Sequence, residues 1–165
     1  MVLGSVPLTI AHVVISLVGI ASGFVIIWGL LKARRLNSWT IVFLTTTVAT
    51  SVTGFIFFPY KGVTPGIVLG IISLVVLAVA IVARYPLRMA GPWSRVYAAT
   101  AVIAEYLNFF VLIAQSFQKI PALHALAPTQ AEPPFAIAQV IALIFFGAAT
   151  VAATIKFRSD KIQAA

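Results

Sequence analysis

Five apolar segments, each about as long as a bilayer is thick, dominate this sequence. A helix needs roughly 20 predominantly apolar residues to cross the hydrocarbon core of a membrane. Because 62% of the 165 residues are hydrophobic and only 8% are charged, no soluble core of this size could bury them all. The sequence therefore predicts an all-α bundle of transmembrane helices in a single domain, 1–165. The five predicted helices cover about residues 7–31, 39–59, 65–84, 94–118 and 134–156.

Residues that commonly begin helices stand at two of the predicted boundaries. Thr64 followed by Pro65 is typical of an N-cap with proline at the first helical position. Thr129 and Glu132 have the spacing of a capping box, whereas Pro133 and Pro134 favour a helix that starts at Glu132. Both alternatives for the last helix are consistent with the sequence.

Lysine and arginine alternate between the two sides of the predicted bundle. Only Lys61 and Lys119 fall on one side. Loops that stay in the cytoplasm collect Lys and Arg, so this pattern predicts an outside N-terminus and a cytoplasmic C-terminus. The net charge of +8 is thereby assigned to membrane topology, and no nucleic-acid partner is predicted. The nine basic residues on the predicted cytoplasmic side are Lys32, Arg34, Arg35, Arg84, Arg88, Arg95, Lys156, Arg158 and Lys161.

Small residues recur at helical spacing in the first and third segments. Ser16, Gly19 and Gly23 share one face of the first, and Gly66 and Gly70 form a similar stripe in the third. Helices in lipid associate through close packing of small residues, because lipid removes the hydrophobic driving force between them. These five positions are therefore predicted helix-packing positions.

A carboxylate interrupts the fourth apolar segment. At 100° per residue, Glu105, Asn108 and Gln115 lie on one face of that helix, and such a polar face is expected to point into the bundle. Glu105 is ten residues from Arg95, or roughly 15 Å deep at 1.5 Å per residue. The same count along the first two helices predicts Ser22, with Gly23 beside it, and Thr47 as the neighbours of Glu105.

Two roles for Glu105 follow from this position. With no Lys or Arg predicted at its depth, desolvation favours the neutral acid, which can join helices through hydrogen bonds. Acids inside membranes also handle protons or substrates. His12, level with Gln115 on the first helix, extends the set of buried polar and proton-path candidates: Glu105, Asn108, Gln115, His12, Ser22 and Thr47.

The two histidines raise a cofactor alternative. His12 and His124 both lie on the predicted outer side, where they are candidate ligands for a b-type haem, although a helix and a loop do not give the usual pair of helix-held ligands. With Glu132 they do not make an evident tetrahedral zinc set, and the chain has no cysteine. No metal site and no cofactor other than this haem alternative are predicted.

The loop between the last two helices carries its own periodicity. Ile120, Leu123 and Leu126 recur at helical spacing between prolines. We expect this loop to fold over the outer mouth of the bundle.

Two stretches, TTTVATSVTGFIFFP (45–59) and YLNFFVLIAQSFQKIPALHALAPTQAEPPF (106–135), resemble a group of small proteobacterial integral membrane proteins that have no assigned activity. The resemblance covers most of the chain, and its most distinctive part is the Ala-Pro-Thr-Gln…Glu-Pro-Pro-Phe element. It implies a bacterial inner membrane, with a periplasmic N-terminus, but no catalytic role.

Three functions are consistent with these features. The first is a non-enzymatic inner-membrane protein that acts as an accessory or interaction subunit or as a homo-oligomer, with the lipid bilayer and another membrane protein or a second copy as partners. The second is a small proton-coupled transporter or channel that uses Glu105, Asn108 and Gln115, although five helices without an inverted repeat are unusual for a transporter. The third is a haem- or quinone-binding redox protein centred on His12.

Overall fold

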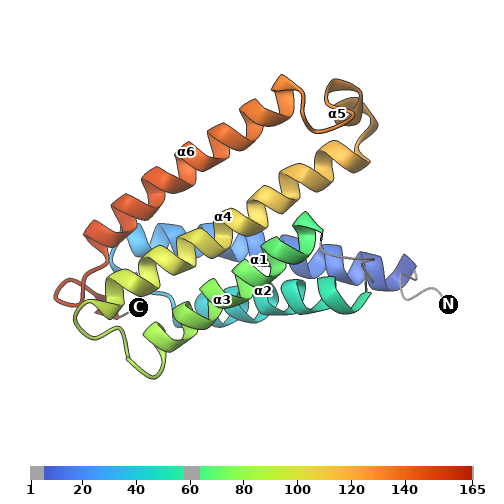
Figure 1. Cartoon of the computed structure of the whole chain (residues 1–165). Coiled ribbons are helices and arrows are strands. Elements are labelled where there is room, and N and C mark those ends of the chain that lie inside the picture. Colours follow the sequence, from blue (N-terminus) through green and yellow to red (C-terminus); the bar gives the residue numbers. More distant parts are fainter. Residues whose placement is uncertain (1–5, 58–63, 165) are drawn as a thin grey trace.

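The computed structural model describes residues 6–57 and 64–164, so Lys61 lies outside the described residues. Five of its helices are long and apolar enough to cross a membrane, which confirms the predicted all-α polytopic bundle (Figure 1). The helix ends that lie inside the described residues agree with the predicted segments to within about two residues, whereas the predicted end of the second segment, at 59, lies outside them. The helices are α1 (Val6–Leu31), α2 (Asn37–Phe57), α3 (Pro65–Arg84), α4 (Trp93–Lys119), the short α5 (Pro121–Leu126) and α6 (Pro133–Lys156).

Two helix starts show the predicted local chemistry. The Thr64 side chain accepts a hydrogen bond from the backbone N–H of Ile67 at 3.4 Å, and Pro65 opens α3. At α6, Glu132 is the N-cap residue and Pro133 opens the helix, so the proline alternative is the one observed. The Glu132 carboxylate instead accepts a hydrogen bond from the Thr129 hydroxyl at 2.8 Å, just before the helix begins.

The helices pack closely at one end of the bundle, which we call the basic end. It comprises the loops 32–36 and 85–92 and the tail 157–164, and the nine basic residues of the predicted cytoplasmic side lie in or next to these segments. The helices α1 with α2, α3 with α4, and α4 with α6 run side by side. Core side chains that are almost fully buried at or near this end include Phe43, Leu77, Ala80, Tyr97, Ala98 and Phe157.

A two-stranded contact ties the tail to the first loop. The strand β1 (Arg34–Arg35) pairs in parallel with β2 (Gln163–Ala164), with Arg35 opposite Ala164. Strands of two residues are too short to produce a sequence pattern, so no strand was predicted here. The pairing fixes the backbone of Arg35 at the basic end.

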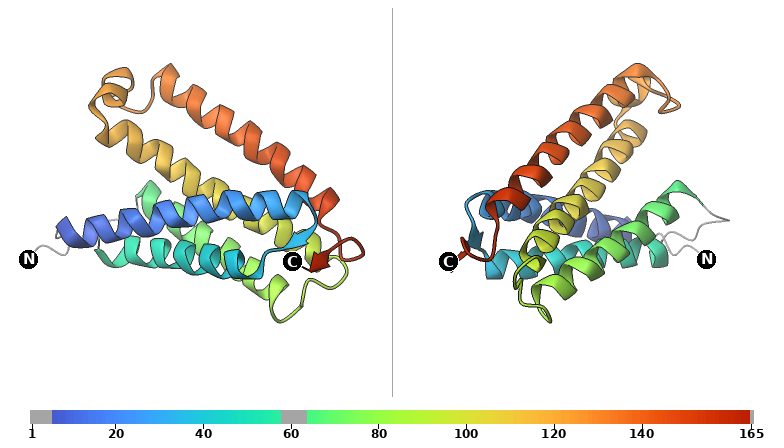
Figure 2. Two further views of the ribbon diagram at one scale, coloured as in Figure 1. Left: turned by 180° about the vertical axis from the view of Figure 1, so that it is seen from behind. Right: turned by 60° about the vertical axis from the view of Figure 1, so that its left-hand side comes forward.

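The opposite end, which we call the open end, is formed by the starts of α1, α3 and α6 and the ends of α2 and α4. There the helices diverge: α4 and α6 lean away from α1 and α2, and α3 leaves in another direction (Figures 1 and 2). Apolar side chains in the first half of α1 are correspondingly exposed, including Ile10, Val14 and Leu17.

The loop between α4 and α6 differs from its expected position. It does form a helix, α5, but α5 packs against α4 and lies beyond the ends of α4 and α6, away from α1 (Figure 2). Ile120 and Leu126 are 47% and 56% exposed. The Gln130 side chain donates a hydrogen bond to the carbonyl of Ala114 at 2.6 Å. This bond and the short connection hold the loop on the two helices that it joins, so it does not cover the mouth.

Candidate functional site

The carboxyl group of Glu105 is buried inside the bundle, halfway along α4. The residue is 0% exposed. Neither Oε1 nor Oε2 has a hydrogen-bond partner among the described residues. Buried polar groups in proteins are almost always hydrogen-bonded, so an acid in this condition is unusual. Glu105 is therefore the strongest candidate for a residue kept for function.

Glycine on α1 makes room for this acid. A Cβ atom at Gly23 would overlap with the Oε2 and Cδ atoms of Glu105. One turn earlier, a Cβ atom at Gly19 would lie 3.2 Å from the Thr46 hydroxyl oxygen of α2. On this face of small residues, α1 therefore packs against α4 at Gly23 and against α2 at Gly19.

The other predicted packing positions have different surroundings. Ser16 donates its hydroxyl hydrogen to the His12 carbonyl at 2.7 Å, within its own helix. Gly70 of α3 faces the ring of Phe55, whose Cζ atom lies 2.6 Å from where a Cβ atom would stand. Gly66 is exposed in the first turn of α3, because the helices have already separated there.

The predicted neighbours Ser22 and Thr47 are buried, at 1% and 0% exposure, but neither is hydrogen-bonded to Glu105. The Ser22 hydroxyl donates to the Gly19 carbonyl at 2.8 Å, as serine in an apolar helix commonly does. The Thr47 oxygen accepts from the Asn108 amide at 3.2 Å. Counting residues from the helix ends located the right depth but could not assign the bonds.

Aromatic rings close the site on the α6 side. Phe24 of α1 meets Phe109 of α4 edge-on, with 5.8 Å between ring centroids. Phe109 meets Phe146 of α6 at 5.4 Å. Tyr106 and Phe145 extend the same cluster through Phe146. The rings give this part of the bundle an apolar wall.

The basic end of α4 is closed as well. One and two turns from Glu105, Ala101 and Ala98 are almost fully buried. Beyond them lies Tyr97, whose hydroxyl oxygen is 3.3 Å from that of Thr40 on α2. Small side chains and close packing thus separate Glu105 from the basic end.

Toward the open end, the polar stripe becomes progressively exposed. Asn108 is half-buried, and Gln115, which was expected to face the interior, is exposed because α4 leans away from α1 at that level. The His12 ring nitrogen Nδ1 lies 2.8 Å from the Thr53 hydroxyl oxygen. The stripe therefore joins the buried acid to the opening.

The histidines do not share a site. His124 is exposed on α5, which both figures place across the opening from α1, the helix of His12. Within residues 6–57 and 64–164, no three His, Cys, Asp or Glu residues are grouped as metal ligands. The geometry consequently gives no support to a haem held by this pair.

One buried charge was missed by sequence reasoning. Arg84 was counted as a topology signal, yet it is only 7% exposed and donates a hydrogen bond to the Asn37 side chain at 2.7 Å. The available signal was its place as the last residue of the apolar run 65–84. Arg84 also lines a cavity of ≈ 290 Å³ at the basic end.

No family model, curated protein or solved structure matches this chain.

Proposed function

We propose that this protein is a non-enzymatic subunit of a larger membrane assembly, completed at its open end by a transmembrane segment of another protein or of a second copy. The supporting observation is that the helices pack at the basic end and diverge at the open end. By the excess of Lys and Arg in cytoplasmic loops, the basic end would be cytoplasmic and the N-terminus periplasmic in a bacterial inner membrane.

The chemistry of the opening favours a protein partner over lipid alone. The face of α4 that points toward α2 through Asn108 continues to Gln115 and Lys119, seven and eleven residues further along. Polar side chains between membrane helices gain about 1 kcal/mol from hydrogen bonds to a neighbouring helix, which lipid tails cannot supply. Most residues in the apolar centre of each spanning helix are also not buried by the rest of the chain. The buried share ranges from 17% in α6 to 39% in α4.

Site-directed cross-linking tests this proposal cleanly, because the chain has no cysteine. In this test the Gln115→Cys variant is labelled in native membranes with a maleimide that carries a photo-activatable cross-linking group. After illumination, we expect one discrete cross-linked adduct. An adduct of twice the 17.6 kDa chain would identify a second copy, and any other discrete mass a different subunit. Ile144→Cys is the matched control, since Ile144 is 66% exposed on α6 and lies on the helix face opposite Ala142, which is buried.

The proposal predicts no adduct at residue 144. Equal labelling at both positions would show random collision, and monomer at both would show that lipid alone fills the opening. Either result would contradict an assembly role.

Proton handling at Glu105 is the second candidate function, and one specific observation favours it. The carboxyl group is buried, has no hydrogen-bond partner among the described residues, and stands at the foot of a polar stripe that reaches the opening. Such an acid can take up a proton from the open end while the packed basic end blocks its release there. This geometry corresponds to the state of an alternating-access cycle in which the acid is reachable from only one side of the membrane.

Proteoliposomes with an entrapped pH indicator test this candidate. We expect acidification driven by a pH gradient with the unaltered protein and none with Glu105→Gln, which cannot exchange a proton. Glu132→Gln, at a partly exposed site beside the open end, should retain it. Flux that survives in Glu105→Gln would rule out this role for Glu105. The third alternative, a redox protein centred on His12, has no supporting observation of its own and is not proposed.

A further inference from the structure

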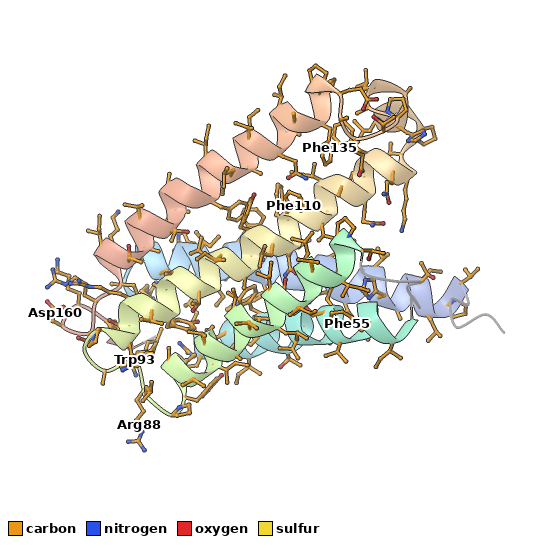
Figure 3. All side chains as sticks on the ribbon, viewed as in Figure 1. Phe55, Arg88, Trp93, Phe110, Phe135 and Asp160 are labelled. Atoms are coloured by element: carbon orange, nitrogen blue, oxygen red, sulfur yellow. The ribbon has the colours of Figure 1, made fainter. Side chains whose placement is uncertain are left out.

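The cavity at the basic end is built around arginine. Arg84 at the end of α3 forms part of its wall, together with Arg35 of the first loop and Arg88 of the second. Asn37, Tyr85 and Met89 complete the polar and aromatic part of the lining. The Arg88 side chain extends away from the bundle (Figure 3), which places its charge at the rim of the cavity.

Several contacts hold Arg84 in place. Nη2 donates to Asn37 Oδ1 at 2.7 Å, and Nη1 lies 3.5 Å from the Met89 sulfur. The guanidinium carbon stands 5.0 Å from the ring centroid of Tyr97 and 5.8 Å from that of Tyr85. Neutral groups thus fix the guanidinium of Arg84, a residue that is 7% exposed, and none of these groups carries a negative charge.

The second loop is shaped to support this arrangement. Arg88 and Met89 have φ angles of 50° and 55°, in the left-handed region that non-glycine residues rarely adopt. The Met89 N–H donates to the Ala83 carbonyl at 2.8 Å, and the Met89 side chain is buried beside Arg84. This turn places Met89 under the guanidinium and leaves Arg88 exposed next to it.

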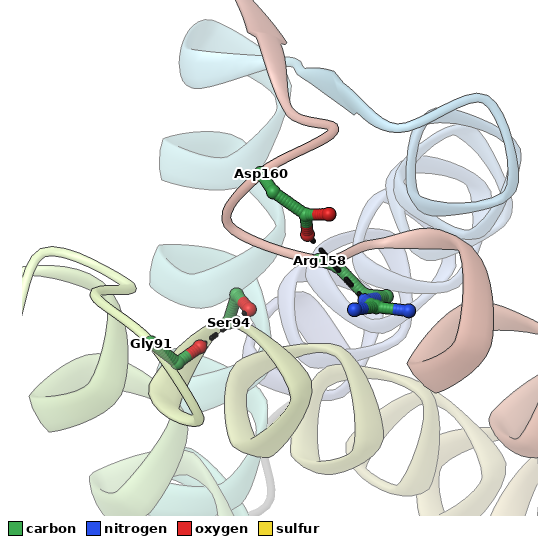
Figure 4. Close-up of polar contacts among 4 residues, drawn as sticks. All are labelled: Gly91, Ser94, Arg158 and Asp160. Atoms are coloured by element: carbon green, nitrogen blue, oxygen red, sulfur yellow. Dashed lines mark hydrogen bonds and ion pairs between the residues drawn. The ribbon is translucent and has the colours of Figure 1, made fainter.

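No described side-chain carboxylate pairs with any of these three arginines. The chain has three acidic residues, and all are described. Asp160 pairs with Arg158 at 3.4 Å, beside the Ser94–Gly91 hydrogen bond that starts α4 (Figure 4). Glu132 bonds Thr129 near the open end, and Glu105 lies midway along α4. Within residues 6–57 and 64–164, no acidic side chain therefore serves the cavity as a counter-ion. Arginine stays charged, and a buried charge is costly unless it is paired.

We propose that this cavity binds the phosphodiester of an anionic phospholipid from the adjoining leaflet. Guanidinium groups match phosphate oxygens in charge and in paired hydrogen-bond geometry. Basic pockets between helix ends at a membrane surface are suited to acidic lipid head groups. Ile41, which also lines the cavity and is 56% exposed, offers an apolar surface for the start of an acyl chain.

Exchanging Asn37 for aspartate gives a direct test. In Asn37→Asp a carboxylate would stand within hydrogen-bond distance of Arg84 and supply the counter-ion internally. We expect the purified variant to bind phosphatidylglycerol roughly tenfold more weakly than the unaltered protein, by native mass spectrometry with detergent-solubilised lipid. Ser38→Asp is the matched control, because it adds the same charge at the adjacent, exposed position and should keep binding within about twofold.

Further arms separate the lipid from other phosphates. Arg88→Gln should weaken phosphatidylglycerol binding about fivefold, whereas Arg95→Gln, at the same end but outside this cavity, should not. Excess inorganic phosphate that displaces the lipid would support a site for the phosphate group. Stabilisation by inorganic phosphate without lipid binding would overturn the lipid proposal in favour of a soluble ligand. Equal retention of phosphatidylcholine and phosphatidylglycerol, or equal binding by all variants, would also overturn it.

Discussion

The carboxyl group of Glu105 on α4 occupies the space that a side chain at position 23 of α1 would need. Each residue thereby explains the other: an acid fits in this apolar setting only because Gly23 has no Cβ atom. The two helices approach closely enough here that even a methyl group is excluded. This relationship gives the most direct test of the packing.

Gly23→Ala should destabilise the protein by about 1–3 kcal/mol, because the added methyl group forces Glu105 or α1 to move. Unfolding in mixed detergent micelles, followed by circular dichroism, measures the change. Gly147→Ala provides the control, since nothing lies within 4 Å of a Cβ atom at that position of α6. The control should be neutral or gain up to about 1 kcal/mol from its better helix propensity. Equal effects at both positions would show that α1 and α4 are not in contact at Gly23.

Removing the acid should partly rescue the crowded variant. Glu105→Ala empties a buried site and should cost about 2–5 kcal/mol, as for other buried large-to-small changes. In the double variant with Gly23→Ala, the new methyl group enters the space that the carboxyl group has left. The double variant should therefore lose about 0.5–3 kcal/mol less free energy of unfolding than the sum of the two single variants. Strict additivity in the same unfolding assay would argue against direct contact between these residues.

Much of this fold could be predicted from the sequence because a bilayer imposes length and polarity on each helix. Apolar runs predicted all five spanning helices, and Thr64 and Pro65 marked one start correctly. Depth counting also brought Glu105 to the level of Gly23, since every helix rises by the same amount per residue.

Other features depend on crossing angles, which apolar periodicity does not encode. The divergence that exposes Gln115 arises from the angle between α4 and α1. The contact between Arg84 and Asn37 joins residues 47 positions apart and could not be inferred from local spacing. Lipid-facing and protein-facing leucines, valines and isoleucines look alike, so the sequence did not reveal where the helices part.

The hydrogen bond between Asn108 and Thr47 should couple α4 to α2. Asn108→Leu and Thr47→Val each remove one partner, and a double-mutant cycle isolates the energy of the pair. We expect a coupling of about 0.6 kcal/mol and at most about 1.7 kcal/mol, which is the range for side-chain bonds between membrane helices. Thr46→Val combined with Asn108→Leu is the control cycle, because Thr46 donates to the Val42 carbonyl of its own helix at 2.7 Å. A coupling in the control equal to that of the Thr47 cycle would exclude a specific bond.

The turn 129–132, which the Glu132 carboxylate holds just before α6, should loosen at acid pH. Desolvation raises the pKa of Glu132, but hydrogen bonds from the Thr129 hydroxyl and from the backbone N–H groups of Thr129 and Ala131 outweigh it and place the pKa below the ordinary 4.5. When folding lowers the pKa of a carboxyl group, the ionised group stabilises the fold at pH values above its pKa in the unfolded state. This stabilisation is lost as the pH falls through its pKa in the folded state. The Thr129 and Ala131 amides should therefore lose protection, relative to their intrinsic exchange rates, as the pH falls through the lowered pKa of Glu132.

Carbon-13 NMR of the side-chain carboxyl groups can follow this titration, because the chain has only three acidic residues. Thr129→Val removes the hydroxyl donor and should move the pKa of Glu132 upward toward 4.5. Thr154→Val is the control, since its exposed hydroxyl bonds the Val151 carbonyl of its own helix. The control should leave the Glu132 titration unchanged. A pKa of Glu132 that is the same in all three proteins would show that the Thr129 hydroxyl does not hold this carboxylate, and the tie that orders the start of α6 would then have to come from the backbone N–H groups alone.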